Sequence, residues 1–103
     1  MIKQVTQQAV EQMITNGDLV IADVRDHDSY IQGHITGAIH LSMVALQQFC
    51  ATTDKNKPIV VYCYHGITSQ AVAQHLLDQG FTQVYSLAGG FSAWKEQFTS
   101  DKK

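Results

Sequence analysis

The chain has few of the residues that mark disulfide scaffolds, zinc proteins or phosphate-binding proteins. Only two of its 103 residues are cysteine, Cys50 and Cys63, and it has one proline and one arginine. Two cysteines are too few for a disulfide framework, and they lack the clustering of a zinc site. If either cysteine is functional, we expect it to act as a thiol.

Basic charge is also scarce. Seven lysine and arginine residues stand against nine acidic ones, which leaves a net charge of −2. This balance argues against a protein that neutralises nucleic acid or anionic lipid. No apolar run approaches the roughly 20 residues of a membrane helix, and the first residues lack a signal-peptide pattern. We therefore expect no nucleic acid or membrane partner, and a cytoplasmic location.

What the chain does contain is typical of one small folded unit. Hydrophobic residues make up 45% and charged residues 16%, which is the balance of a globular protein. A chain of this length buries a single core. We therefore predict one domain over residues 1–103.

Helical and strand-like segments alternate along the chain. Helical spacing or capping residues predict helices at 6–16 (capped by Thr6), 29–32, 42–50 (capped by Ser42), 69–79 and from Ser92 through Trp94 and Phe98. Apolar runs predict strands at 19–24, 58–62 and 83–87, and the glycine-punctuated stretch 33–41 predicts a loop with a brief strand. Such alternation predicts an α/β fold with a parallel sheet covered on both faces.

The candidate reactive residue is Cys63, which follows the most apolar predicted strand and precedes a predicted helix. Ligands of open parallel sheets bind beyond the carboxyl ends of the strands. Loop amides and a helix N-terminus there would stabilise an anion and lower the pKa of a thiol. Gly66 would let the loop turn back on itself. We interpret Cys63 as a thiolate nucleophile and Cys50 as a buried apolar residue.

Two chemistries share such a cysteine loop, and the basic residues help to separate them. Cysteine phosphatases hold phosphoryl oxygens with an arginine in this loop. No arginine or lysine occurs between Pro58 and Phe91, and Ser69 stands six residues after Cys63. The only arginine, Arg25, lies beside Asp23, where an ion pair is the simpler role. Phosphate-ester hydrolysis is therefore disfavoured.

Three separated motifs resemble the signatures of the rhodanese family, and of its small single-domain bacterial members in particular. The first comprises Asp23-Val24-Arg25, Tyr30, His34-Ile35, Gly37-Ala38 and Leu41. The second is the loop Cys63-Tyr64-His65-Gly66-Ile67-Thr68-Ser69. The third comprises Val84-Tyr85, Leu87-Ala88-Gly89-Gly90-Phe91 and Trp94. Their order and spacing cover essentially the whole chain.

The resemblance implies a rhodanese-like fold, with a central five-stranded parallel sheet and helices on both faces. It implies thiosulfate sulfurtransferase activity, in which Cys63 takes the outer sulfur of thiosulfate as a persulfide. Cyanide, or a thiol such as reduced thioredoxin, would then remove that sulfur. The substrate and the persulfide would bind in the loop formed by Tyr64, His65, Gly66, Ile67, Thr68 and Ser69. No cofactor and no metal is implied.

Loop length and loop charge qualify the resemblance. The six-residue loop from Cys63 to Thr68 is that of sulfurtransferases, whereas related phosphatases carry one residue more. Many family members place basic side chains where this chain has Tyr64 and Thr68, so thiosulfate would bind weakly and the physiological donor could be another sulfane compound.

For the supporting residues we favour structural roles. We expect Asp23 and Arg25 to form an ion pair and His34 to be a hydrogen-bonded turn histidine. For His65, two roles stay open. It could act beside the thiolate as a base or anion donor, or it could be a solvent-facing loop residue.

Three alternatives to a sulfurtransferase stay open at this point. The first is a cysteine-based phosphatase or arsenate reductase, which would use the same loop. The second is a non-catalytic sulfur-carrier or recognition module, which the intact cysteine makes less attractive. The third is a redox protein with a Cys50–Cys63 disulfide.

Overall fold

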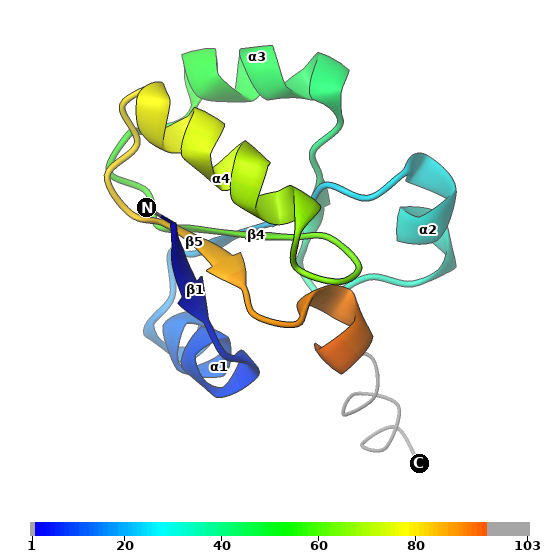
Figure 1. Ribbon diagram of the computed structural model, residues 1–103. Helices are drawn as coiled ribbons and strands as arrows, with labels where there is room; N and C mark the ends of the chain where they lie inside the picture. The colour runs from blue at the N-terminus through cyan, green and yellow to red at the C-terminus, as the bar shows by residue number, and fades with distance from the viewer. Residues whose placement is uncertain (1, 95–103) are drawn as a thin grey trace.

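Five parallel strands form the centre of the computed structural model, which describes residues 2–94 (Figure 1). The strands are β1 (Lys3–Val5), β2 (Val20–Asp23), β3 (Ile39–His40), β4 (Ile59–Tyr62) and β5 (Val84–Leu87). Their order across the sheet is β1-β5-β4-β2-β3, and every neighbouring pair is parallel. The predicted α/β class and the five-stranded parallel sheet are confirmed.

The residues themselves predicted four of these strands, and the missing one is β1. It has three residues and pairs along one side with β5, placing Val5 opposite Leu87. So short a segment shows no periodicity of its own. Its strand conformation depends on hydrogen bonding to β5, which is distant in the sequence.

Helices cover both faces of the sheet, as predicted. In Figure 1, α3 and α4 lie on one side, while α1 and the helical residues 90–94 lie on the other. Strand β4 contributes side chains to the core on both faces of the sheet, because successive side chains of a strand point to opposite faces. Ile59 and Val61 belong to the core under α3 and α4, whereas Val60 and Tyr62 belong to the core over α1.

The predicted caps of two helices are confirmed. Helix α1 (Gln7–Asn16) begins after Thr6, whose hydroxyl accepts a 3.2 Å hydrogen bond from the backbone N–H of Ala9. Helix α3 (Met43–Thr52) begins in the same way after Ser42, with a bond of 3.1 Å. Capping residues act over one helical turn, so these starts can be predicted from local sequence.

Two helix starts differ from the prediction, and a third, near Ser69, agrees to within one residue. Helix α2 (His27–Gln32) begins two residues early because the Asp26 carboxylate caps it. Helix α4 (Thr68–Asp78) begins one residue before Ser69. The last helix is already helical at residue 90, so Ser92 lies inside it and does not cap it. Phe98 lies outside the described residues. Within residues 2–94, no helix has the length and apolar character to cross a membrane.

The start of this last helix packs against the loop that joins β4 to α4. The backbone N–H groups of Phe91 and Ser92 donate 2.8 Å bonds to the carbonyls of Cys63 and Tyr64. Gly90 has a φ of +62°, and a Cβ atom there would lie 2.5 Å from the Tyr64 carbonyl oxygen. The loop backbone therefore occupies the space that any other side chain at position 90 would need.

We predict that Gly90→Ala destabilises the protein far more than Gly37→Ala. Gly37 also has a positive φ, +86°, but a Cβ atom added there would meet nothing within 4 Å. The control should cost about 1–2 kcal/mol from backbone strain alone, and Gly90→Ala about 3 kcal/mol or more, because overlap adds to strain. Denaturant unfolding measures both. Equal losses would contradict the close approach.

Candidate active site

Cys63 lies directly after β4, at the edge of the sheet where the parallel strands end. The chain then turns through Gly66, which has a φ of +89°, and enters α4. A Cβ atom at Gly66 would lie 3.1 Å from the backbone of residues 87 and 89, so the turn is also tightly packed. The cysteine is 6% exposed and sits inside the curl of its own loop.

The sulfur atom is surrounded by hydrogen-bonding groups of the loop and the first turn of α4. The backbone N–H groups of Gly66 and Ser69 each donate to Cys63 Sγ at 3.2 Å. The Ser69 hydroxyl lies 3.4 Å from Sγ. Two amides and one hydroxyl therefore converge on a single atom, which is an arrangement suited to a negative charge.

These contacts change the acidity of the thiol. Burial by itself would raise the pKa of Cys63, because it disfavours the charged form. The hydrogen bonds from the Ser69 hydroxyl and from the amides of Ser69, Gly66 and Ile67 act in the opposite direction. Together they outweigh burial and hold the pKa of the Cys63 thiol below its ordinary value. The site therefore favours a thiolate.

Four side chains of the loop are exposed to solvent. Tyr64, His65, Ile67 and Thr68 are all exposed, and Ile67 is 74% exposed. The His65 ring rests edge-on against Tyr64, with 4.6 Å between ring centroids. The hydrogen bonds to Sγ come from Gly66 and Ser69, and His65 has the position of a solvent-facing loop histidine. The loop acts on the sulfur mainly through its backbone.

Two polar residues that support this loop were missed in the sequence. The Ser86 hydroxyl, on β5, lies 2.8 Å from the Ser69 hydroxyl, and both serines are fully buried. The Gln70 amide donates a 2.8 Å bond to the Gly66 carbonyl. A serine within an otherwise apolar strand was the available signal for Ser86. Gln70 has no comparable signal, because a glutamine in a helix is ordinarily solvated.

Asp23 and Arg25 form the ion pair that their positions predict. Arg25 Nη2 lies 2.7 Å from Asp23 Oδ2, with Asp23 fully buried. Arg25 also donates to the Gly33 carbonyl, and its guanidinium carbon lies 4.1 Å from the Phe91 ring centroid. The Tyr62 hydroxyl donates to Asp23 at 2.7 Å, and burial followed by this bond raises the pKa of Tyr62. The only arginine is therefore engaged within the fold.

The remaining predicted residues take structural positions. His34 Nδ1 lies 2.8 Å from the Tyr30 carbonyl, and its ring stacks on Tyr30 with 3.9 Å between centroids. Cys50 lies on α3 and packs in the buried apolar core, as predicted. Both cysteines are free thiols in this structure. Among residues 2–94, no group of three or more His, Cys, Asp or Glu side chains is placed to hold a metal ion.

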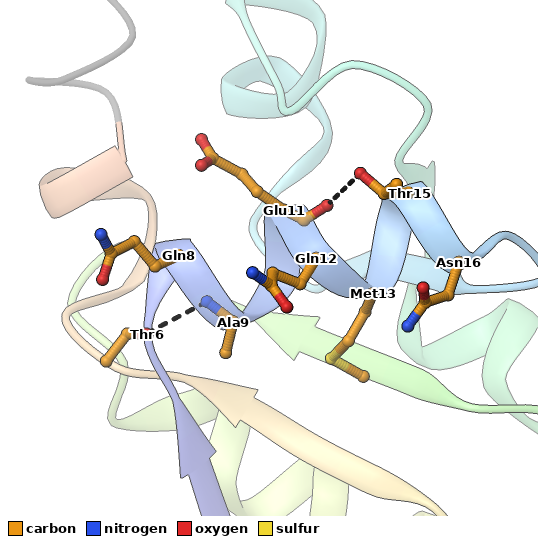
Figure 2. A pocket seen from close by; sticks show the side chains of 8 residues that line it. All are labelled: Thr6, Gln8, Ala9, Glu11, Gln12, Met13, Thr15 and Asn16. Carbon is orange, nitrogen blue, oxygen red and sulfur yellow. Dashed lines mark hydrogen bonds between the residues drawn. The ribbon is translucent and has the colours of Figure 1, made fainter.

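A broad hollow along α1 is the main competing location for a site (Figure 2). Its lining is mostly polar and comprises Thr6, Gln8, Ala9, Glu11, Gln12, Met13, Thr15 and Asn16. Glu11 is the only titratable residue among them, and none is a cysteine. This surface lacks the paired catalytic groups or the activated nucleophile that a reaction needs. The chemistry is better placed at Cys63.

Comparison with known proteins identifies relatives over nearly the whole chain. The chain is 55% identical over 102 residues to the thiosulfate sulfurtransferase GlpE of Coxiella burnetii, covering 98% of this chain and 95% of that protein. It is 51% identical over 85 residues to the thiosulfate sulfurtransferase GlpE of Shewanella oneidensis, covering 82% and 84% of the two chains.

Comparison of structures and of family patterns agrees with these relatives. The solution structure of a rhodanese-like domain from Anabaena sp. superimposes with a TM-score of 0.81 at 28% identity, covering 93% of this chain and 75% of that one. Residues 6–97 match the family described as the rhodanese-like domain. The predicted family resemblance is confirmed, and the chain belongs to the rhodanese family.

Proposed function

We propose that the chain is a thiosulfate sulfurtransferase in which Cys63 carries the transferred sulfur as a persulfide. The observation that carries this proposal is the position of Cys63 Sγ within hydrogen-bond reach of the Gly66 and Ser69 amides and the Ser69 hydroxyl. The relatives named thiosulfate sulfurtransferase, which reach 55% identity over 98% of the chain, support the choice of substrate.

In the first half-reaction, the Cys63 thiolate attacks the outer sulfur of thiosulfate. A bond forms between Sγ and that sulfur, the S–S bond of thiosulfate breaks, and sulfite leaves with the bonding electron pair. The product is a persulfide whose negative charge lies on the outer sulfur. The loop amides of Gly66 and Ser69, which donate to Sγ in this structure, and the N-terminus of α4 place partial positive charge around this anion.

In the second half-reaction, a thiophilic acceptor takes the outer sulfur and returns the Cys63 thiolate. Cyanide would leave as thiocyanate, and a thiol such as that of reduced thioredoxin would first become a persulfide itself. Neither step needs an obligatory proton shuttle, which suits a loop without Asp or Glu between Cys63 and Ser69. Two half-reactions through a covalent intermediate give ping-pong kinetics.

Phosphate-ester hydrolysis fits this site less well. A cysteine phosphatase needs a planar cation to hold the phosphoryl oxygens in pairs. The stretch between Pro58 and Phe91 has no arginine or lysine, and Arg25 is held by Asp23 and the Gly33 carbonyl. The neutral loop therefore offers little positive charge to a dianionic phosphoryl group. Thiosulfate is also a dianion, and we expect it to bind weakly for the same reason, but the covalent persulfide that it leaves carries a single charge.

Intact mass measurement tests the persulfide directly. After incubation with thiosulfate, we expect the protein to gain the mass of one sulfur atom and to lose it when cyanide is added. Cys63→Ser should gain none and should reduce sulfur transfer to the rate without enzyme. The matched control is Cys50→Ala, which removes the other thiol and should retain the adduct. An adduct that survives in Cys63→Ser would exclude the proposed carrier.

The acidity of Cys63 gives a prediction for pH. Because hydrogen bonds favour the thiolate, the pKa of Cys63 lies below its ordinary value. Alkylation of Cys63 by iodoacetamide should therefore rise with pH to a plateau, with a midpoint below that of an unperturbed cysteine, since only the thiolate reacts. The guanidinium-unfolded chain serves as the reference and should have the higher midpoint. Coincident midpoints for folded and unfolded chains would show that the loop does not activate the thiol.

A phosphotyrosine mimic distinguishes the competing activity. We expect p-nitrophenyl phosphate to be hydrolysed no faster by the wild-type protein than by Cys63→Ser, because no loop cation holds the phosphoryl group. The same two preparations, assayed with thiosulfate and cyanide, should differ. Phosphatase turnover that depends on Cys63 would favour the phosphatase over the sulfurtransferase.

A further inference from the structure

The Cys63 sulfur is the first atom of a buried line of three polar atoms. Ser69 Oγ lies 3.4 Å from Sγ, and Ser86 Oγ lies 2.8 Å from Ser69 Oγ. The two serines are 0% exposed. Ser86 does not contact the sulfur and comes from β5, the strand that pairs with β4.

Ser86 occupies a position that the fold would otherwise give to an apolar side chain. It pairs with Val61 across the two central strands, and Val84, two residues earlier on the same face of β5, packs in the core under α3 and α4. A hydroxyl buried there is costly unless it is hydrogen-bonded. Its hydrogen-bond partner among the described side chains is Ser69.

Each hydroxyl has one hydrogen to donate and two lone pairs that accept, so the line has two settings. With Cys63 as a thiol, the S–H group donates to Ser69 Oγ, and the Ser69 hydroxyl donates to Ser86 Oγ. With Cys63 as a thiolate, the Ser86 hydroxyl donates to Ser69 Oγ, and the Ser69 hydroxyl donates to Sγ. Only two hydroxyl hydrogens rotate between the settings, and the heavy atoms stay in place.

We propose that Ser86 is a positioning residue for sulfur transfer, because its hydroxyl turns the Ser69 hydroxyl toward the sulfur whenever Cys63 is a thiolate. This inference rests on the proposed role of Cys63 as the nucleophile. The thiolate is present at the start and end of each cycle, whereas in the persulfide the negative charge has moved to the outer sulfur.

Other titratable and charged groups surround Cys63, but they are engaged elsewhere or exposed. Asp23, Arg25 and Tyr62 are joined to one another at the ends of β2 and β4. Tyr64 and His65 are exposed on the loop. Helix α4 carries no titratable side chain before His75, and residues 86–94 carry none. The serine pair is therefore the element whose removal should move the ionisation of Cys63 most directly.

The test is the midpoint of Cys63 alkylation by iodoacetamide against pH, followed by peptide mapping, in a double-mutant cycle. We expect Ser69→Ala to raise the midpoint by about one pH unit and Ser86→Ala by about half a unit, because each loses donation to the thiolate. If Ser86 acts through Ser69, the double variant should match Ser69→Ala alone. A Ser86→Ala midpoint equal to that of the wild type would overturn the proposal, as would additive shifts in the double variant.

A control on the same strand separates positioning from general loss of stability. Val84→Ala removes buried side-chain atoms from the same face of β5 without touching the hydroxyl pair. It should lower the denaturation midpoint and leave the alkylation midpoint unchanged; a shift as large as that of Ser86→Ala would mean that the effect is merely structural. The sulfur adduct on the wild-type protein, measured by intact mass, reports the proposed function independently of these shifts.

Discussion

The loop between β4 and α4 has to turn its backbone N–H groups inward onto one sulfur atom, and much of the surrounding structure follows from this demand. When the amides point in, the carbonyls must find donors elsewhere. Those of Cys63 and Tyr64 accept from Phe91 and Ser92, and that of Gly66 accepts from Gln70. The last helix must therefore start close to the loop, and only glycine fits at position 90.

The same arrangement determines the electrostatics of the site. Backbone amides and the Ser69 hydroxyl surround the sulfur, and the loop has no basic side chain. These neutral dipoles suit the single charge of a thiolate, and they offer no cation to pair with phosphoryl oxygens. The single arginine is engaged in the fold: with Asp23 and Tyr62 it joins the ends of β2 and β4, and with Gly33 it holds the turn after α2. The outward-facing Tyr64 and Ile67 leave the rim of the site largely uncharged.

Local sequence predicted those parts of the fold that depend on local physics. Thr6 and Ser42 cap helices within one turn of themselves, and the apolar runs of β2, β4 and β5 indicate buried strands without reference to the rest of the chain. Local sequence did not predict the elements whose conformation depends on a distant part of the chain. Strand β1 is a strand because β5 lies beside it, and the last helix begins at residue 90 because its first amides meet the carbonyls of the loop between β4 and α4.

For the site, the sequence by itself predicted Cys63 as the reacting residue and the kind of chemistry, from a cysteine after a buried strand, a glycine three residues on, a helix to follow and no nearby cation. It also determined the family, because three motifs in the right order are specific. The tertiary structure alone decided how the sulfur is held. Ser69 and Ser86 are 17 residues apart and come together only because β5 pairs with β4 beneath α4. Which buried hydroxyls meet depends on strand register, and register is a property of the assembled sheet.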